Sequence, residues 1–411
     1  MKKKYLAFLC SINDINQVLG PHEDLFKKID NNFDKFYIIN FIYLKLFSDI
    51  SGTKNIFNDN TKKIIEVPKN LEIFTPKSIN EFKKFMFDKQ IVGIQNLSRN
   101  LSDLLIHYII AKFKIQQIMI SNFGFFNTKF KTSMNDKISR PFANFFYFLN
   151  KPIGQKIILF LTNIRIFNKI EIRFTSDKGM LERINKNFIK KILYKLNLFY
   201  SKEIVLINSK NYDCFNNKTF QENQNKIVLL DIFFDHPDGS SIIKKISDEN
   251  KKKHYINLKL FIDKISNHFG KKVTVCIHPK DNLENKKLIF KNYDVKQYET
   301  QKNIYEAFLV LYFDTSAIVD AILLKKKIIF ITSKYIPNTW LELGKSFADK
   351  SNILNLDIED NLETSISSLE NKLELQTLKY DNYINNFIKI DGDKKGLDVV
   401  INTLKKNFFL I

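Results

Sequence analysis

The sequence predicts an α/β protein made of two Rossmann-like domains, each built on a parallel sheet. The first observation is the length of 411 residues, which suits two domains of ordinary size better than one. The second is the short-spaced alternation of strand-like and helix-like segments along both halves of the chain. Such alternation indicates parallel βαβ units with right-handed crossovers.

Apolar runs that end before polar loops predict the strands of the N-terminal domain, residues 1–208. Ser98 is placed to cap the N-terminus of one of its helices. Strands are expected at Tyr5–Ser11, Phe36–Phe41, Gln90–Gln95, Ile115–Ser121 and Glu203–Asn208, and helices near His22–Ile29 and Arg99–Phe113. Residues 209–225 are rich in Asn, Lys and Gln and are expected to form the interdomain linker.

The alternation is clearer in the C-terminal domain, residues 226–385. The helix Tyr255–Phe269 has apolar residues at helical period and is followed by Gly270, a common helix stop. Strands are expected at Ile227–Ile232, Lys272–His278, Tyr293–Tyr298, Leu309–Phe313, Ile328–Thr332 and Ile353–Ile358, and helices at Asn303–Phe308, Thr315–Leu324, Thr339–Lys350 and Asn361–Leu373. Residues 386–411 are expected to form a helix that packs back on the N-terminal domain. Two such domains and a returning helix describe the GT-B architecture, in which two sheets face a cleft.

Basic residues exceed acidic ones, and they concentrate in one stretch. The chain carries 65 Lys and Arg against 44 Asp and Glu, a net charge of +21. A codon bias towards Lys would explain much of this excess without any function. Residues 140–195, expected to be mostly helical, hold twelve basic and three acidic residues together with an aromatic cluster at Phe145–Phe148. This mixture suits an anionic membrane surface, and the alternative is a buried helix pair with a basic outer face.

The chain's cysteines and its first apolar run bear on its location. Cys10, Cys214 and Cys276 stand far apart without a metal-binding spacing, so they are expected to be reduced. The run Tyr5–Ile12 is short and leads into Asn13 with no small-residue cleavage site, which favours a first strand over a signal peptide. We therefore expect a cytoplasmic protein that associates peripherally with the inner membrane.

A histidine stands where one strand of the C-terminal domain is expected to end. The segment KVTVCIH ends at His278, and Pro279 and Lys280 follow. Ligands of open parallel sheets bind beyond the carboxyl ends of the strands, so this imidazole and this ammonium are candidates to contact a phosphate. The alternative is a surface loop with an incidental His-Pro pair.

A second group of polar residues follows a nearby strand. Asp314, Thr315 and Ser316 come directly after Leu309–Phe313 and open an expected helix. Backbone N–H groups and hydroxyls at a helix N-terminus form an anion site, although an ordinary N-cap would use the same residues. Because both strand ends lie at one edge of one sheet, a nucleotide monophosphate or diphosphate is expected between them.

Carboxylates near other strand ends are candidates for further roles. Asp231 and Asp235 follow the first strand of the C-terminal domain and could deprotonate an acceptor hydroxyl, or could simply cap a turn. Asn13 and Asp14 follow the first strand of the chain and are candidates for acceptor contact. Glu342 is a candidate to accept hydrogen bonds from a ribose.

The order of these motifs resembles that of a known group of enzymes. In GT-B sialyltransferases and polysialyltransferases, a His-Pro motif and a downstream Ser/Thr motif hold the CMP part of the donor. Teichoic-acid polymerases carry a similar helix-capping pair. The region from Ile227 to Ser333 is also similar to bacterial proteins of surface-carbohydrate (capsule or lipopolysaccharide) biosynthesis, through VLLDIFFDHPD, YINLKLFIDKISNHFGKKVTVCIHPK and FDTSAIVDAILLKKKIIFITS. The N-terminal acidic motif that supplies the base in the sialyltransferases has no clear copy here.

The resemblance implies a GT-B glycosyltransferase with a nucleotide-sugar co-substrate, no other cofactor and no essential metal. No Asp-x-Asp motif follows a strand, and a helix N-terminus with basic side chains can stabilise a leaving phosphate. The expected donor is a CMP-linked acidic sugar, and the expected acceptor is a surface polysaccharide or a lipid-linked glycan. The alternatives are a CDP-polyol phosphotransferase of teichoic-acid type and a non-enzymatic basic binding protein. The order of the phosphate motifs argues against a non-enzymatic binding protein and against a nucleic-acid partner.

Overall fold

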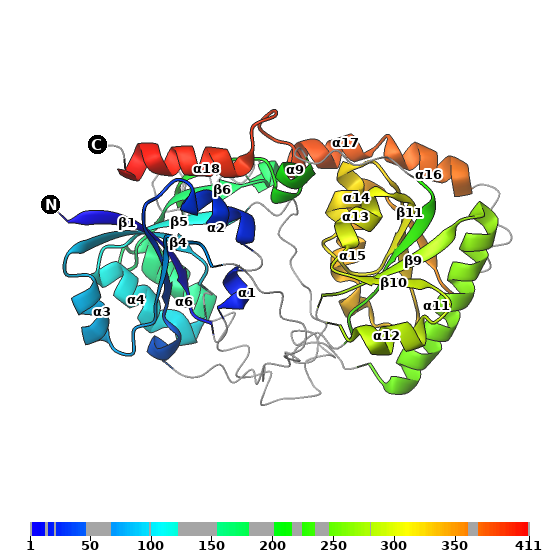
Figure 1. Cartoon of the computed structure of the whole chain (residues 1–411), viewed down its shortest axis with the longest axis horizontal. Helices are drawn as coiled ribbons and strands as arrows, with labels where there is room; N and C mark the ends of the chain where they lie inside the picture. Colours follow the sequence, from blue (N-terminus) through cyan, green and yellow to red (C-terminus); the bar gives the residue numbers. More distant parts are fainter. Residues whose placement is uncertain are drawn as a thin grey trace. The chain divides into compact units, whose positions relative to one another are not determined.

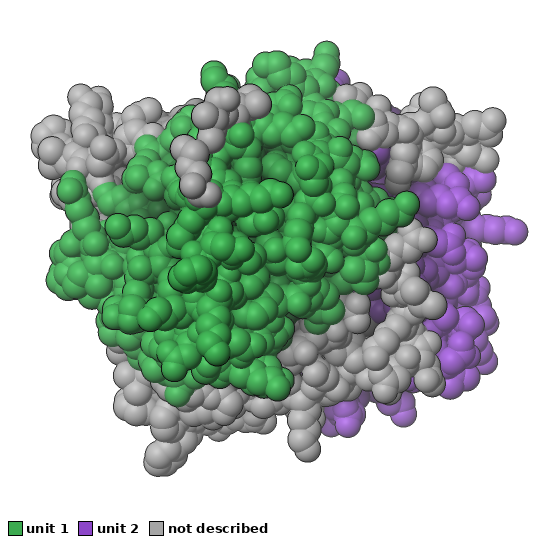
Figure 2. Space-filling view, turned by 60° about the vertical axis from the view of Figure 1, so that its left-hand side comes forward, with its two compact units in different colours: residues 1–123, 142–213, 389–411 green, residues 124–141, 214–388 purple. Residues whose placement is uncertain are grey.

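The computed structural model describes residues 2–12, 15–19, 22–46, 67–97, 100–121, 154–180, 201–215, 224–234, 246–279, 281–360 and 369–409. These residues divide into two compact units (Figures 1 and 2). Unit 1 takes in the described residues of 1–123, 142–213 and 389–411, and unit 2 those of 214–388. Each unit is built on a parallel sheet with helices packed against it, which confirms the predicted α/β class with two Rossmann-like sheets.

The sheet of unit 1 has seven strands in the order β3-β2-β1-β4-β5-β6-β7. The strands are β1 (Lys3–Cys10), β2 (Phe36–Asn40), β3 (Leu71–Phe74), β4 (Lys89–Gln95), β5 (Gln116–Ser121), β6 (Ile170–Thr175) and β7 (Ser201–Leu206). Along β1, alternate side chains enter two separate cores, Phe8 on one face of the sheet and Leu9 on the other. A central strand buried on both faces explains why β1 is apolar along nearly its whole length.

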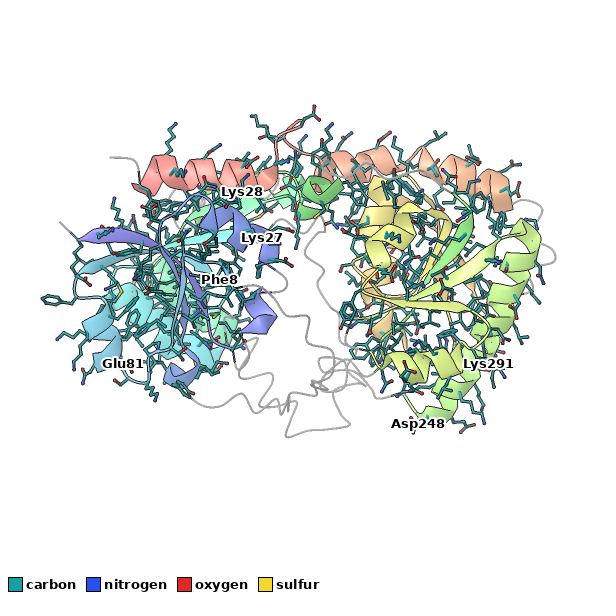
Figure 3. The ribbon with its side chains drawn as sticks, in the orientation of Figure 1. Phe8, Lys27, Lys28, Glu81, Asp248 and Lys291 are labelled. Atoms are coloured by element: carbon teal, nitrogen blue, oxygen red, sulfur yellow. The ribbon has the colours of Figure 1, made fainter. Side chains whose placement is uncertain are left out.

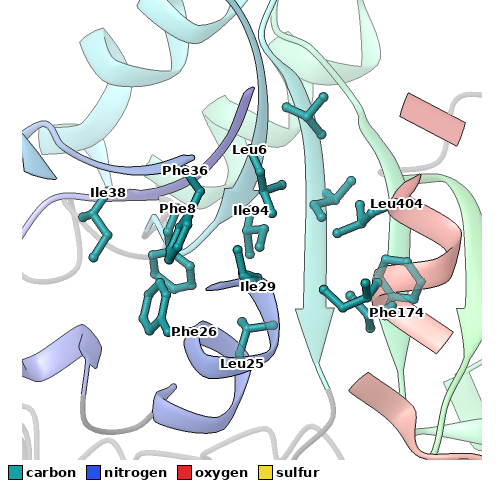
Figure 4. Close-up of a cluster of buried hydrophobic side chains, with 14 of the residues drawn as sticks. Leu6, Phe8, Leu25, Phe26, Ile29, Phe36, Ile38, Ile94, Phe174 and Leu404 are labelled. Carbon is teal, nitrogen blue, oxygen red and sulfur yellow. The ribbon is translucent and has the colours of Figure 1, made fainter. Parts of the chain in front are cut away.

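Helices cover both faces of this sheet (Figure 1). Helix α2 (Glu23–Asp30) packs Phe26 against Phe8 of the sheet, and Leu404 of helix α18 (Gly396–Leu404) lies in the same core near Phe174 (Figure 4). On the other face lie α3 (Ile79–Phe85) and α4 (Leu104–Lys112), and α6 (Gly154–Asn163) contacts α4. The remaining short helices of this unit are α1 (Asn16–Leu19), η1 (Ile42–Leu44), η3 (Leu101–Asp103), α9 (Lys210–Phe215) and η10 (Lys405–Phe409).

The chain re-enters unit 1 at a fixed point before α18. The Asp213 carboxylate accepts hydrogen bonds from the backbone N–H groups of Gly396 (2.9 Å) and Leu397 (3.1 Å), and so caps the N-terminus of α18. The Asn208 side chain accepts from the N–H groups of residues 390 and 391 and donates to the carbonyls of residues 392 and 394. These bonds hold the returning segment beside β7 and α9.

The sheet of unit 2 has six strands in the order β10-β9-β8-β11-β12-β13. The strands are β8 (Lys226–Leu230), β9 (Lys272–Ile277), β10 (Asp294–Gln297), β11 (Ala307–Tyr312), β12 (Lys327–Thr332) and β13 (Leu354–Asp357). The helices are α11 (Asp248–Phe269), α12 (Leu283–Ile289), α13 (Thr300–Tyr305), α14 (Ile318–Leu323), η6 (Asn338–Trp340), α15 (Glu342–Ser351), α16 (Leu369–Thr377), α17 (Tyr380–Tyr383) and η9 (Ile384–Ile388). The long α11 is capped by the Ser247 hydroxyl and ends at Gly270 in the left-handed conformation.

The structure adds detail to two of the sequence-based expectations. Within residues 140–195, expected to be mostly helical, Ile170–Thr175 is strand β6, where Ile170, Ile172 and Phe174 alternate with polar residues. The sequence-based prediction missed this strand, because its period of two closely follows the helical pattern of α6 in the sequence. Within the expected linker 209–225, residues 209–213 belong to unit 1, and Lys210–Phe215 form α9.

Candidate functional site

Both sheets change their winding direction at the centre, and these points locate the candidate sites. In unit 1 the chain order reverses between β1 and β4, and in unit 2 it reverses between β8 and β11. Ligands of open α/β sheets bind outside the carboxyl ends of the strands at such a switch point. The segments after β8, β9 and β11 in unit 2, and those after β1 and β4 in unit 1, are therefore the candidates.

His278 follows β9 in a loop that the protein holds rigidly. Its ring stacks on Phe233, with ring centroids 4.8 Å apart and an interplanar angle of 4°. The side-chain amide of Gln297, at the end of β10, donates to the carbonyl groups of His278 (3.4 Å), Pro279 (3.2 Å) and Asp281 (2.9 Å). The imidazole thus has one defined orientation at the carboxyl edge of the sheet.

Asp231, directly after β8, lies in a buried ion pair. Its Oδ2 accepts from Lys286 Nζ at 2.5 Å, and the same ammonium lies 3.2 Å from Asp281 and bonds the Tyr255 hydroxyl. Burial alone would lower the pKa of Lys286, but the charge of Asp231, followed by Tyr255 and Asp281, raises it above its usual range. Asp231 therefore connects β8 to α12, and its role as a catalytic base stays a prediction.

Asp314 follows β11 and caps a different helix from the one that the sequence suggests. Its carboxylate accepts from the backbone N–H of Gly344 at 2.6 Å, and also from that of Leu343, in the first turn of α15. Burial raises the pKa of Asp314 to about 7 despite these bonds, and the nearby Glu342 charge raises it further. An internal carboxylate thus occupies the anion position at the start of α15, where Glu342 is the first residue.

Thr315 and Ser316 form a turn before a helix, and the expected helix start at Thr315 is wrong. Helix α14 begins at Ile318, and the Thr315 hydroxyl accepts from the N–H of Ala317 at 3.2 Å. Ser316 is exposed at the same edge of the sheet. Since β9 and β11 flank β8, the two strands that lead to His278 and Thr315 lie roughly 10 Å apart, which is two strand spacings. Four predicted site residues lie outside the described residues: Asn13, Asp14, Asp235 and Lys280.

A cavity opens at the switch point of unit 1, and it was not predicted from the sequence. It has a volume of about 100 Å³ and is lined in part by Phe8, His22, Asp24, Asn96 and Lys210. Phe8 comes from β1, Asn96 follows β4, and His22 directly precedes α2. Ile120 of β5 and Leu397 of α18 also line it, so side chains from six separate segments converge on one hollow at the carboxyl edge of this sheet.

His22 is the chemically distinctive residue of this cavity. Its ring lies 5.0 Å from that of Phe8, and Lys210 forms an ion pair with Asp24 at 3.6 Å. Burial, with a further contribution from the Lys210 charge, lowers the pKa of His22 to about 4. The imidazole is therefore neutral near pH 7, so it can accept a proton or a hydrogen bond from a hydroxyl. Its only sequence signal is its place in a Gly-Pro-His turn between the first strand and the first long helix.

The described residues contain neither a metal site nor a membrane-spanning helix. No group of His, Cys, Asp and Glu side chains in this part of the chain is arranged to hold a metal ion. Among the same residues, no helix combines the length and the apolar character needed to cross a membrane.

The two doubly wound units define a protein of the GT-B fold class. CalG4, the calicheamicin glycosyltransferase, is similar with a TM-score of 0.51 and 8% identity, over 99% of this chain and 100% of that one. A variant of the wall teichoic acid polymerase TagF, soaked with CDPG, is similar with a TM-score of 0.50 and 12% identity, over 98% of this chain and 88% of that one. No protein-family model and no curated protein matches the sequence. At these identities the similarity establishes the fold.

Proposed function

We propose that this protein is a glycosyltransferase that moves a sugar from a nucleotide-activated donor to a surface-polysaccharide or lipid-linked acceptor in the cytoplasm. The donor that we propose first is a CMP-linked acidic sugar. The observation that carries the proposal is the carboxyl edge of unit 2, where His278 follows β9 and Thr315 and Ser316 follow β11, the two strands that flank β8 at the switch point. Solved GT-B structures with the same two-sheet layout include a glycosyltransferase, which supports this class.

The donor would bind with its phosphate near the loop after β9. His278 is oriented by stacking on Phe233 and by the Gln297 bonds to its loop, so little ordering would be needed on binding. In this proposal Pro279 keeps the loop rigid, Lys280 adds charge, and the turn of Asp314, Thr315 and Ser316 lies by a second phosphate oxygen. Glu342 would accept hydrogen bonds from the ribose.

A comparison of two histidines tests the donor site. His278→Ala should weaken the binding of CMP, measured by calorimetry, by about 1.5–3 kcal/mol because a charge-assisted hydrogen bond is lost. His268→Ala is the matched control, since His268 is exposed at the C-terminal end of α11, next to the amino end of β9. Equal affinity in both variants would remove His278 from the site. A panel of CMP, CDP, UDP and GDP identifies the nucleotide.

The acceptor would bind in the unit 1 cavity, with its hydroxyl on His22. The imidazole is unprotonated near pH 7 and would take the hydroxyl proton as a general base of low strength, because burial lowers its pKa, whereas Asp231 is engaged by Lys286. Asn13 and Asp14 remain proposed acceptor contacts, and Asp231 and Asp235 remain the alternative bases. His22→Asn should lower turnover about 10²–10⁴-fold and leave CMP affinity unchanged. Full turnover in this variant would move the base to Asp235.

The proposal includes no essential metal and no cofactor beyond the donor. Basic side chains and N–H groups would stabilise the leaving phosphate, so transfer should continue unchanged in EDTA. A loss of transfer in EDTA that Mg²⁺ restores would contradict this part of the proposal. If CDP-glycerol rather than a CMP-sugar supports transfer, the protein is instead a polyol phosphotransferase that uses the same edge.

A further inference from the structure

Three large apolar side chains of unit 1 are exposed together at the end of α6. Phe160 is 61% exposed, Ile164 49% and Ile166 53%. Phe160 and Ile164 lie one turn apart on the same side of the helix, and the Ile164 N–H donates to the Phe160 carbonyl at 3.0 Å. Single exposed apolar residues need no explanation, but such a group marks an interaction surface.

The protein fixes the loop that carries this group. Phe167 is buried beside His107, with ring centroids 6.0 Å apart. The Asn168 side chain donates to the carbonyls of Ile115 (3.0 Å) and Ile110 (3.4 Å) at the end of α4. With residues 167 and 168 anchored in this way, residues 164–166 are held outward as part of the fold.

The charges around the apolar group are basic. The sequence from 154 to 169 contains Lys156, Arg165 and Lys169 and has no Asp or Glu. Lys156 is exposed one turn before Phe160, and Arg165 is exposed between the two isoleucines. The charges of Arg165 and Lys202, after burial, lower the pKa of Lys169, as expected where cations gather. The nearby Glu171 is paired with Lys202 at 2.7 Å.

We propose that Phe160, Ile164 and Ile166, with Lys156, Arg165 and Lys169 around them, form a docking surface for an anionic lipid bilayer. Apolar side chains would enter the boundary between headgroups and acyl chains, while the basic ones contact anionic headgroups. This occupant suits the surface better than a nucleic acid, because two of the three apolar residues are aliphatic and cannot stack on bases. The proposal is independent of the donor and acceptor sites.

Vesicle binding with a matched pair of variants tests the proposal. Wild-type protein should float with vesicles of equal parts phosphatidylglycerol and phosphatidylcholine, weakly with phosphatidylcholine alone, and less as salt rises. The double variant Phe160→Ser/Ile164→Ser should bind at least tenfold more weakly. Phe87→Ser is the control, because Phe87 is 83% exposed in the same unit but belongs to a different segment, the connection between α3 and β4. Equal binding by the two variants, or no binding by the wild type, overturns the proposal.

Tryptophan fluorescence gives a second measurement, which does not need a variant that has lost its vesicle binding. The chain has one tryptophan, Trp340, which is buried in unit 2. Phe160→Trp should shift its emission to the blue when the anionic vesicles are added, and Phe87→Trp should not. No shift in Phe160→Trp overturns the proposal. The proposal would also be overturned if the wild type bound single-stranded oligo(U) RNA as tightly as the anionic vesicles and if Phe160→Ser/Ile164→Ser left this RNA binding unchanged. The surface would then bind polyanions in general.

Discussion

The carboxyl edges of the two sheets share a topology but differ in construction. At the switch point of unit 2, the strand ends are fastened by the buried Asp231–Lys286 pair, by the Asp314 cap and by the Gln297 amide. At the switch point of unit 1, a cavity remains, and its Asp24–Lys210 pair is partly exposed (the side chains of this unit are drawn in Figure 3). Under the proposed function, the fastened edge of unit 2 would hold the nucleotide, and the hollow edge of unit 1 would hold the acceptor.

The largest expected effect comes from breaking the buried ion pair of unit 2. Lys286→Met leaves the Asp231 carboxylate buried without its partner, which should lower the free energy of unfolding by about 3–5 kcal/mol. Lys253→Met is the control, because the Lys253–Glu249 pair on α11 is exposed, and it should cause no measurable change. Urea denaturation of both variants checks this, and the double variant Lys286→Met/Asp231→Leu should recover much of the loss.

A smaller effect is expected from adding one methyl group in each unit, at Gly344 in α15 and at Gly93 within β4. A Cβ at Gly344 would lie 1.8 Å from the backbone oxygen of Phe313, which cannot move away without shifting β11. A Cβ at Gly93 in unit 1 would meet the Leu9 side chain at 2.4 Å, and that side chain can rotate. Gly344→Ala should therefore cost about 1–3 kcal/mol and Gly93→Ala less, in thermal or urea unfolding. The reverse order would show that unit 2 is the more adaptable one.

The pH dependence of stability gives a third test. The pKa of Asp314 is raised from 3.8 to about 7, so the native state binds this proton more tightly than the unfolded chain does. The resulting stabilisation is fully present below about pH 4 and is lost as the pH rises through about 7. Relative to Asp314→Asn, the wild type should lose up to about 1.4 kcal/mol of unfolding free energy per pH unit in this range. Parallel pH profiles for the two proteins would contradict the raised pKa.

The smallest effect is expected at the unit 1 cavity. Asp24→Asn removes the partner of Lys210 at a partly exposed position, which should change the unfolding free energy by less than about 1 kcal/mol. A chemically identical substitution, Asp231→Asn, should cost several times more because that carboxylate is buried with Lys286. Similar losses for the two substitutions would remove the contrast between the edges.

Much of the fold could be predicted from the sequence because local patterns carry it. The apolar runs at Lys272–Ile277 and Lys327–Thr332 and the helical period before Gly270 are readable without any tertiary information. Strand β3 (Leu71–Phe74) was not predicted, because four residues are too short a run to show a period, and in the structure they are only partly buried or exposed. For the candidate site, the strand-end positions of His278 and Thr315 could be predicted, since His278 follows β9 directly and Thr315 comes three residues after the end of β11.

By itself, the sequence determined the two α/β domains, the parallel sheets and the residues that stand at the ends of their strands. Only the tertiary structure decided what those residues contact. Asp231 meets Lys286 across 55 residues of sequence, and Asp314 meets Gly344 across 30. The cavity around His22 likewise needs β1, β4, α2 and α9 in place together. The physical reason is that local patterns are set by neighbours in the chain, whereas burial, ion pairing and shifted pKa values depend on which distant segments the fold packs together.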